Sequence, residues 1–121
     1  MQTVLLVEDD PAIRRLVEEA LIDRGLEVRA APDDRTAQRV LEREAPHIGV
    51  LIADVHLGAS ANGFDVAQRA RRLNPRIEVV YITGRGLDVE RFGVHGGVLM
   101  HKPFDIDNLS DVVEALARDP V

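Results

Sequence analysis

Short apolar runs alternate along the chain with longer segments in which apolar residues recur at helical spacing. The runs at residues 4–7 and 48–53 end abruptly on acidic side chains, a pattern typical of strands buried within a parallel sheet. Further segments at residues 27–31, 77–82 and 98–100 predict three more strands. The pattern therefore predicts five strands, separated from one another by longer polar or amphipathic segments.

The segment after the first strand carries the clearest helix signals. Asp10 and Pro11 mark the helix start, with Asp10 as the N-cap, and Gly25 marks its end. The residues predicted to share its buried face are Ile13, Leu16, Val17, Ala20 and Leu21. This segment therefore predicts an amphipathic helix directly beyond the first strand.

The remaining helices follow the other strands. Asp33 or Asp34 caps the second helix, and two more are predicted at residues 64–73 and 106–116. The Gly-rich stretch 85–97 predicts only a short, loosely held helix. Five strands alternating with five helices indicate an α/β protein with a doubly wound parallel sheet.

The size and composition limit the functional classes. We expect one domain over residues 1–121, because no linker or repeat interrupts the pattern. The formal net charge of −6 argues against direct nucleic-acid binding, which depends on clustered Lys and Arg. The chain contains no cysteine, which excludes a thiolate nucleophile or metal site. Since neither a signal peptide nor a membrane span is visible, we expect a cytoplasmic protein without membrane contact.

Reactive side chains stand where the predicted strands end. Glu8 and Asp9 follow the first strand, Asp54 the third, Thr83 the fourth and Lys102 the fifth. In a doubly wound sheet these ends share one edge, where ligands bind. Three carboxylates at one edge repel one another, and Mg²⁺ would offset their charge. We expect Asp9 and Asp54 as direct ligands, Glu8 through water, and a main-chain carbonyl from the loop after Asp54.

The same residues suit phosphoryl transfer. Asp54 can act as a carboxylate nucleophile. Lys102, the Thr83 hydroxyl and the metal ion would stabilise charge on the transferring oxygens. Each motif alone also has an ordinary structural explanation, such as an acidic helix start or a turn. Their joint occurrence at the strand ends favours the functional explanation.

Together, the motifs at residues 5–10, Asp54, residues 83–84 and residues 102–104 resemble those of response-regulator receiver domains in two-component signalling. The resemblance implies a flavodoxin-like sheet with the strand order 2-1-3-4-5. It also implies that a histidine kinase or histidine phosphotransfer protein donates the phosphoryl group and that a downstream protein target responds. The chain is then no enzyme beyond its own Mg²⁺-dependent phosphorylation and dephosphorylation.

The resemblance also implies a role for each metal ligand. Glu8 and Asp9 are the acidic pair that holds Mg²⁺, and the phosphoacceptor Asp54 shares the ion. The main-chain carbonyl of His56 completes the protein ligands. Mn²⁺ is expected to substitute for Mg²⁺ at this site.

In the family, the remaining residues bind the phosphoryl group and transmit its presence to the surface of the domain. Thr83 corresponds to the switch hydroxyl, Lys102 contacts the phosphoryl group, and the Lys102–Pro103 peptide bond is expected to be cis. The face formed by residues 84–118 then changes its affinity for a partner. Its last strand and last helix are a candidate surface for a weak homodimer.

Two features depart from the family pattern. Leu99 stands where members often carry an aromatic residue that moves with the threonine, and Tyr81 on the preceding strand is not its equivalent. The loop after Asp54 has Gly58 where many members have Pro, and it reaches Gly63 one residue late. Neither departure removes a residue needed for phosphorylation.

Two other functions fit parts of the same pattern. A small phosphatase of the haloacid dehalogenase kind also uses an aspartyl nucleophile, but it usually needs a second acid where this chain has His56. A pseudo-receiver would use the fold for protein contacts and never accept phosphate. Incubation with acetyl phosphate and Mg²⁺ separates these functions from the receiver function.

Overall fold

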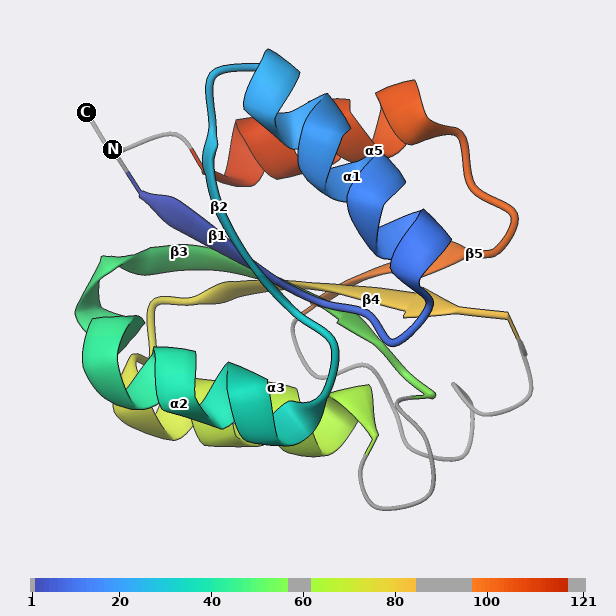
Figure 1. The fold of residues 1–121 in the computed structure, drawn as a ribbon. Coiled ribbons are helices and arrows are strands. Elements are labelled where there is room, and N and C mark those ends of the chain that lie inside the picture. The colour runs from blue at the N-terminus through green and yellow to red at the C-terminus, as the bar shows by residue number, and fades with distance from the viewer. Residues whose placement is uncertain (1, 57–61, 85–96, 118–121) are drawn as a thin grey trace.

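The computed structural model describes residues 2–56, 62–84 and 97–117. Its centre is a sheet of five parallel strands in the order β2-β1-β3-β4-β5 (Figure 1). The strands are β1 (Thr3–Val7), β2 (Glu27–Ala31), β3 (Ile48–Asp54), β4 (Glu78–Thr83) and β5 (Gly97–His101). The flavodoxin-like fold and its strand order are therefore confirmed.

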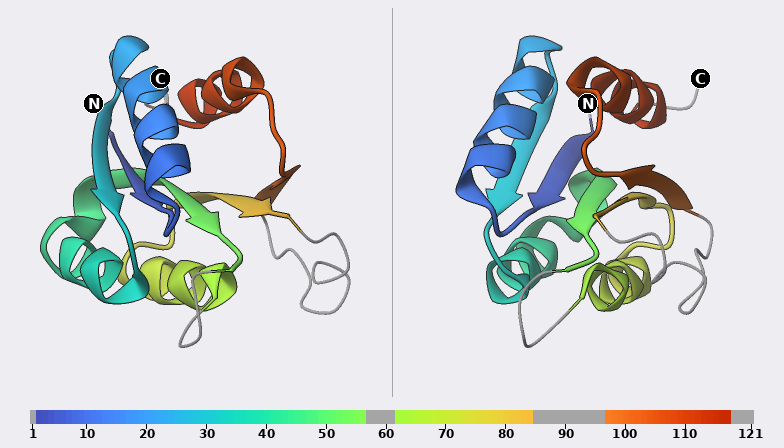
Figure 2. Two further views of the ribbon diagram at one scale, coloured as in Figure 1. Left: turned by 45° about the vertical axis from the view of Figure 1, so that its right-hand side comes forward. Right: turned by 90° about the vertical axis from the view of Figure 1, so that its right-hand side faces the viewer.

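Helices cover both faces of this sheet. Figure 2 shows α1 (Pro11–Asp23) and α5 (Ile106–Leu116) on one face, and α2 (Asp34–Glu44) and α3 (Gly63–Leu73) on the other. A short 3-10 helix, η1 (Ala45–His47), leads into β3. The fifth predicted helix falls at residues 85–97, of which residues 85–96 lie outside the described part of the chain and Gly97 begins β5.

The core forms one layer on each side of the sheet. Successive side chains of a strand point to opposite faces, so Leu5 and Val7 pack toward α2 and α3 while Val4 and Leu6 pack toward α1 and α5. Every residue of β1 and β3 is buried. This burial on both faces explains why the two strands appear as continuous apolar runs in the sequence.

Side-chain caps determine where the helices begin. Asp10 Oδ1 accepts a hydrogen bond of 2.9 Å from the main-chain N–H two residues later. Asp33, one of the two predicted caps of α2, accepts a hydrogen bond of 2.7 Å from the N–H three residues later. Asn62 and Asp105 cap α3 and α5 in the same way. Such a cap contributes about 1 kcal/mol to stability.

One residue predicted to lie in the core is exposed. Val17 and Leu21 are buried and Ile13 packs against them, as predicted, but 51% of Leu16 is exposed. Neighbouring residues on a helix are turned by about 100° from one another. Because Val17 points into the core, Leu16 lies at the edge of the buried face beside exposed Arg15.

Gly63 brings the start of α3 against the end of β3. A Cβ atom on Gly63 would lie 2.5 Å from the main-chain oxygen of Asp54, closer than real side chains come. Gly63→Ala must therefore push the two elements apart, and we expect it to lower the free energy of unfolding by about 1–3 kcal/mol in urea denaturation. Gly84→Ala is the control, because no described atom lies within 4 Å of its Cβ position. Equal losses in both variants would contradict this close contact.

Candidate functional site

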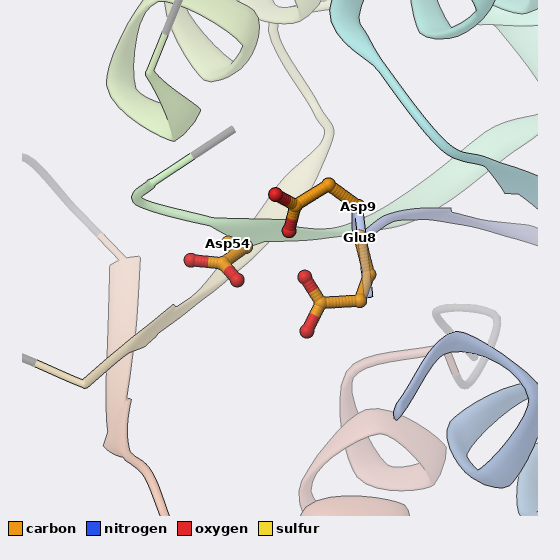
Figure 3. Close-up of side chains that lie close together, drawn as sticks. All are labelled: Glu8, Asp9 and Asp54. Atoms are coloured by element: carbon orange, nitrogen blue, oxygen red, sulfur yellow. The ribbon is translucent and has the colours of Figure 1, made fainter. Parts of the chain in front are cut away.

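Three carboxylates meet at the carboxyl ends of β1 and β3. Glu8 and Asp9 follow β1 directly, and Asp54 is the last residue of β3. One oxygen of each carboxylate lies within 4.8 Å of the others. Figure 3 shows the three side chains gathered beyond these strand ends. In the sheet, β2 lies on one side of β1 and β4 lies on the opposite side of β3, so the order of the strands reverses between β1 and β3. Ligands of doubly wound folds bind at this switch point.

Two of these carboxylates are buried. Only 1% of Glu8 and 3% of Asp54 is exposed, whereas Asp9 is exposed to solvent. The Oε2 atom of Glu8 is buried and has no hydrogen-bond partner in the described part of the chain. A buried carboxylate oxygen without a donor is unfavourable. A proton or a cation at this atom would therefore be stabilised.

Lys102 connects the two buried acids. Its Nζ atom lies 2.9 Å from Glu8 Oε1 and 2.7 Å from Asp54 Oδ2. The other oxygen of Asp54, Oδ1, accepts a hydrogen bond of 2.9 Å from the main-chain N–H of His56. Lys102 follows β5 and precedes a cis peptide bond to Pro103, as the resemblance implied. Both oxygens of Asp54 are thus held in place.

An open hollow of about 430 Å³ lies over the cluster. Its lining residues are Asp9, Asp10, Asp54, His56, Gly84 and Lys102. Thr83 is fully buried at the end of β4, and its main-chain oxygen accepts a hydrogen bond of 2.8 Å from the Lys102 N–H. The structure therefore brings Glu8, Asp9, Asp54 and Lys102 together, with His56 at the rim and Thr83 at the adjoining strand end.

Two contributors to the site go beyond the sequence-based prediction. Asp10, predicted only as a helix cap, also lines the hollow. Arg14 donates a hydrogen bond of 3.0 Å from Nη1 to the main-chain oxygen of Glu8. Arg14 lies four residues after Asp10, and residues at this spacing are neighbours on a helix surface. The spacing is a signal that could have placed Arg14 near the site.

Burial and charge together set the protonation of the cluster. Burial raises the pKa of Glu8 to about 8, and the Asp54 carboxylate adds to this rise while Lys102 opposes it. Burial also raises the pKa of Asp54, but the neighbouring protonated Glu8 carboxyl and the hydrogen bonds from Lys102 and the His56 N–H outweigh burial and leave that pKa below its ordinary value. Burial lowers the pKa of Lys102, yet its two carboxylate partners raise it overall. Without a metal ion, Glu8 is therefore the acid that holds a proton at neutral pH.

The donor set fits a hard divalent cation. Mg²⁺ prefers carboxylate and carbonyl oxygens and keeps several waters, for which the open hollow has room. Among the residues that the structure describes, no histidine joins the three-carboxylate group. A cation here would compete with the proton on Glu8, because a ligand carboxylate must be deprotonated.

Comparison with known protein sequences gives consistent matches. A family model for the response regulator receiver domain matches residues 4–114. The transcriptional regulatory protein TcrA of Mycobacterium tuberculosis is 33% identical over 118 residues, which cover 95% of this chain and 46% of TcrA. The probable transcriptional regulatory protein TcrX of the same organism is 31% identical over 119 residues, covering 96% of this chain and 50% of TcrX. The chain thus spans about half the length of these relatives.

Solved structures share the whole fold. A response regulator receiver protein from Sinorhizobium medicae WSM419 has a TM-score of 0.86 and 30% identity, covering 98% of this chain and 97% of that one. The receiver domain of the hybrid histidine kinase CckA has a TM-score of 0.82 and 29% identity, covering 96% of this chain and 99% of that one. The strand order, the acidic cluster and these matches together show that the chain belongs to the response regulator receiver domain family of two-component signalling.

Proposed function

We propose that Asp54 is the phosphoryl acceptor of this receiver, and that Lys102 and Thr83 stabilise the transferring group. The double contact of Lys102 carries the proposal, because its Nζ lies 2.7 Å from Asp54 Oδ2 and 2.9 Å from Glu8 Oε1 beside the hollow. An ammonium group held there can also bind an anionic phosphoryl oxygen. The lowered pKa of Asp54 keeps its carboxylate ionised, as a nucleophile must be.

The transfer exchanges a P–N bond for a P–O bond. A carboxylate oxygen of Asp54 attacks the phosphorus, the bond to the donor histidine breaks, and the leaving imidazole takes a proton from solvent. Lys102 then bonds a phosphoryl oxygen in place of Asp54 Oδ2, and the Thr83 hydroxyl donates to another. The N–H of His56 keeps the second carboxyl oxygen of Asp54 in position.

We also propose the ligands of the metal ion. Glu8, Asp9, Asp54 and the main-chain carbonyl of His56 would hold Mg²⁺, or Mn²⁺ in its place, with Glu8 acting through water. Support comes from the grouped carboxylate oxygens and from the buried Oε2 of Glu8, which has no partner among the described residues. When bound, the ion would neutralise negative charge on the phosphoryl oxygens.

Mg²⁺ should raise the melting temperature of the protein, and Asp9→Ala should remove most of this rise. Asp9 is exposed, so its loss leaves the core intact while removing a charged ligand. We expect the variant to bind Mg²⁺ at least about 10-fold more weakly, measured by thermal melts at increasing Mg²⁺. Asp65→Ala, which removes an exposed acid in the first turn of α3, is the control and should keep the wild-type response. A full metal response in Asp9→Ala would refute the ligand assignment.

The proposal includes the partners and the output surface. A histidine kinase or histidine phosphotransfer protein would donate the phosphoryl group to one receiver unit formed by residues 1–121. A downstream protein target would read the state of the face at residues 84–118. Within that face, β5 and α5 are the surface proposed for a weak homodimer, and the edge strand β5 exposes Val98.

The cellular compartment of the receiver is proposed from the proteins that would donate its phosphoryl group. Histidine kinases act with cytoplasmic ATP, so we place the receiver in the cytoplasm, without direct contact to nucleic acid or membrane. In the part of the chain that the structure describes, no helix is long and apolar enough to cross a membrane.

Acetyl phosphate tests the proposed function. With Mg²⁺, the full chain should gain the mass of one phosphoryl group, and hydroxylamine should remove it because acyl phosphates are labile. Chelation of Mg²⁺ should slow the gain strongly. A chain that gains no mass would be a pseudo-receiver, whereas Asp54-dependent turnover of a small phosphate ester would indicate a phosphatase. Either result would overturn the proposal.

A further inference from the structure

Tyr81 is a buried phenol that the proposed phosphoryl transfer does not use. Only 3% of it is exposed, and it is the single tyrosine in a chain that has no tryptophan. It precedes Thr83 by two positions on β4, so the two side chains lie on the same face of the sheet. Tyr81 is therefore the residue of β4 that precedes the proposed switch threonine on that face.

Tyr81 contacts α3 at two points. Its ring centroid lies 4.8 Å from that of Phe64, with the ring planes tilted by 41°. The side chain of Arg71 hydrogen-bonds the Tyr81 hydroxyl. Phe64 and Arg71 are seven residues apart, which places them on the same face of the helix. One side chain thus links β4 to α3 along two helical turns.

Tyr81 also fills the space over the start of β5. A Cβ atom on Gly97 would lie 2.6 Å from Tyr81 Cε2 and 3.1 Å from the main-chain oxygen of Val79. The register partners of Tyr81 are Ala53 on β3 and Leu99 on β5, and Leu99 packs against the same core layer. The ring is therefore so close to β5 that it cannot move toward this strand without displacing its backbone.

We propose that Tyr81 transmits the state of Thr83 to α3 and to the first residue of β5, an inference that rests on the proposed phosphorylation of Asp54. A phosphoryl group that draws the Thr83 hydroxyl toward it shifts the end of β4. A shift of β4 moves Tyr81 against Phe64 and Gly97, because the ring is already in close contact with both residues. Close-packed side chains adopt a few discrete arrangements, so the ring must change from one arrangement to another. Helix α3 and β5 then respond together.

Tyrosine emission of the full chain tests this inference directly, because all of it arises from Tyr81. Beryllofluoride with Mg²⁺ serves as a stable phosphoryl mimic, and fluorine NMR measures its occupancy. We expect the emission to change in proportion to occupancy, and Thr83→Ala at equal occupancy to lose the change. Bound beryllofluoride without an emission change would overturn the inference and leave the proposed function standing. A protein that binds no beryllofluoride would overturn both.

Amide NMR shifts separate the contacts of Tyr81. Tyr81→Phe keeps the ring against Phe64 and Gly97 but loses the hydroxyl that Arg71 bonds. We expect its beryllofluoride-induced shifts to shrink around Arg71 and to persist at Phe64 and Gly97, while Tyr81→Leu should lose all three. Val80→Ala loosens the opposite face of β4 and, as the control, should keep the wild-type shifts. Wild-type shifts in both Tyr81 variants would overturn the inference.

Discussion

Asp54→Asn should eliminate phosphorylation by acetyl phosphate, the largest effect that we expect from one substitution in this chain. The asparagine side chain keeps an oxygen for the His56 N–H but lacks the nucleophilic carboxylate and the charge that Lys102 binds. The fold should persist, because removing one of three neighbouring carboxylates reduces their repulsion. Intact-mass spectrometry after incubation with acetyl phosphate and Mg²⁺ gives the result, and circular dichroism verifies folding.

Asp65→Asn is the matched control for this experiment. Asp65 is an aspartate like Asp54, but it lies in the first turn of α3, is exposed and does not line the hollow. We expect this variant to gain one phosphoryl group, as the wild type does. An undiminished mass gain in Asp54→Asn would show that another carboxylate accepts the group, and the assignment of Asp54 would be wrong.

The fold class and the residues that form the site could be predicted from the positions at which the apolar runs end. Glu8 and Asp54 follow runs that are buried on both faces, so the ends of these strands are visible in the sequence. Parallel strands then bring Glu8, Asp54, Thr83 and Lys102 to one edge. The order of the strands needed the family resemblance, because alternation of strands and helices alone allows several topologies.

The side-chain pairs that join distant segments could not be predicted in this way. Arg24 at the end of α1 bonds Asp111 and Glu114 of α5, at 2.6 and 2.9 Å. No local pattern distinguishes Arg24 from the other surface arginines, because the pairing depends on how α1 and α5 lie against each other. The exposure of Leu16 likewise depends on the rotation of α1 about its axis, which the helical period alone does not determine.

The metal-free protein should lose stability as the pH rises from about 5 to about 8, and Glu8 is the cause. Burial raises the pKa of Glu8 from 4.5 to about 8. The folded state therefore holds this proton more tightly than the unfolded chain, so the stabilisation is complete below the unfolded pKa and is lost as the pH approaches the folded pKa. The loss amounts to roughly 3–5 kcal/mol, at about 1.4 kcal/mol per pKa unit. The lowered pKa of Asp54 affects stability only near and below 3.8, outside this range.

Glu8→Gln isolates the contribution of Glu8 to this pH dependence. Mg²⁺ should reverse the sign of the pH dependence of stability in the wild type. The variant has no acid at this position, so its free energy of unfolding in urea should stay nearly constant where the wild type declines. Other groups that titrate in this range do so in both proteins and cancel in the comparison. With saturating Mg²⁺ the wild type should instead gain stability as the pH rises, because the ion binds the deprotonated carboxylates. Equal metal-free profiles would mean that Glu8 stays ionised and that Lys102 alone compensates its buried charge.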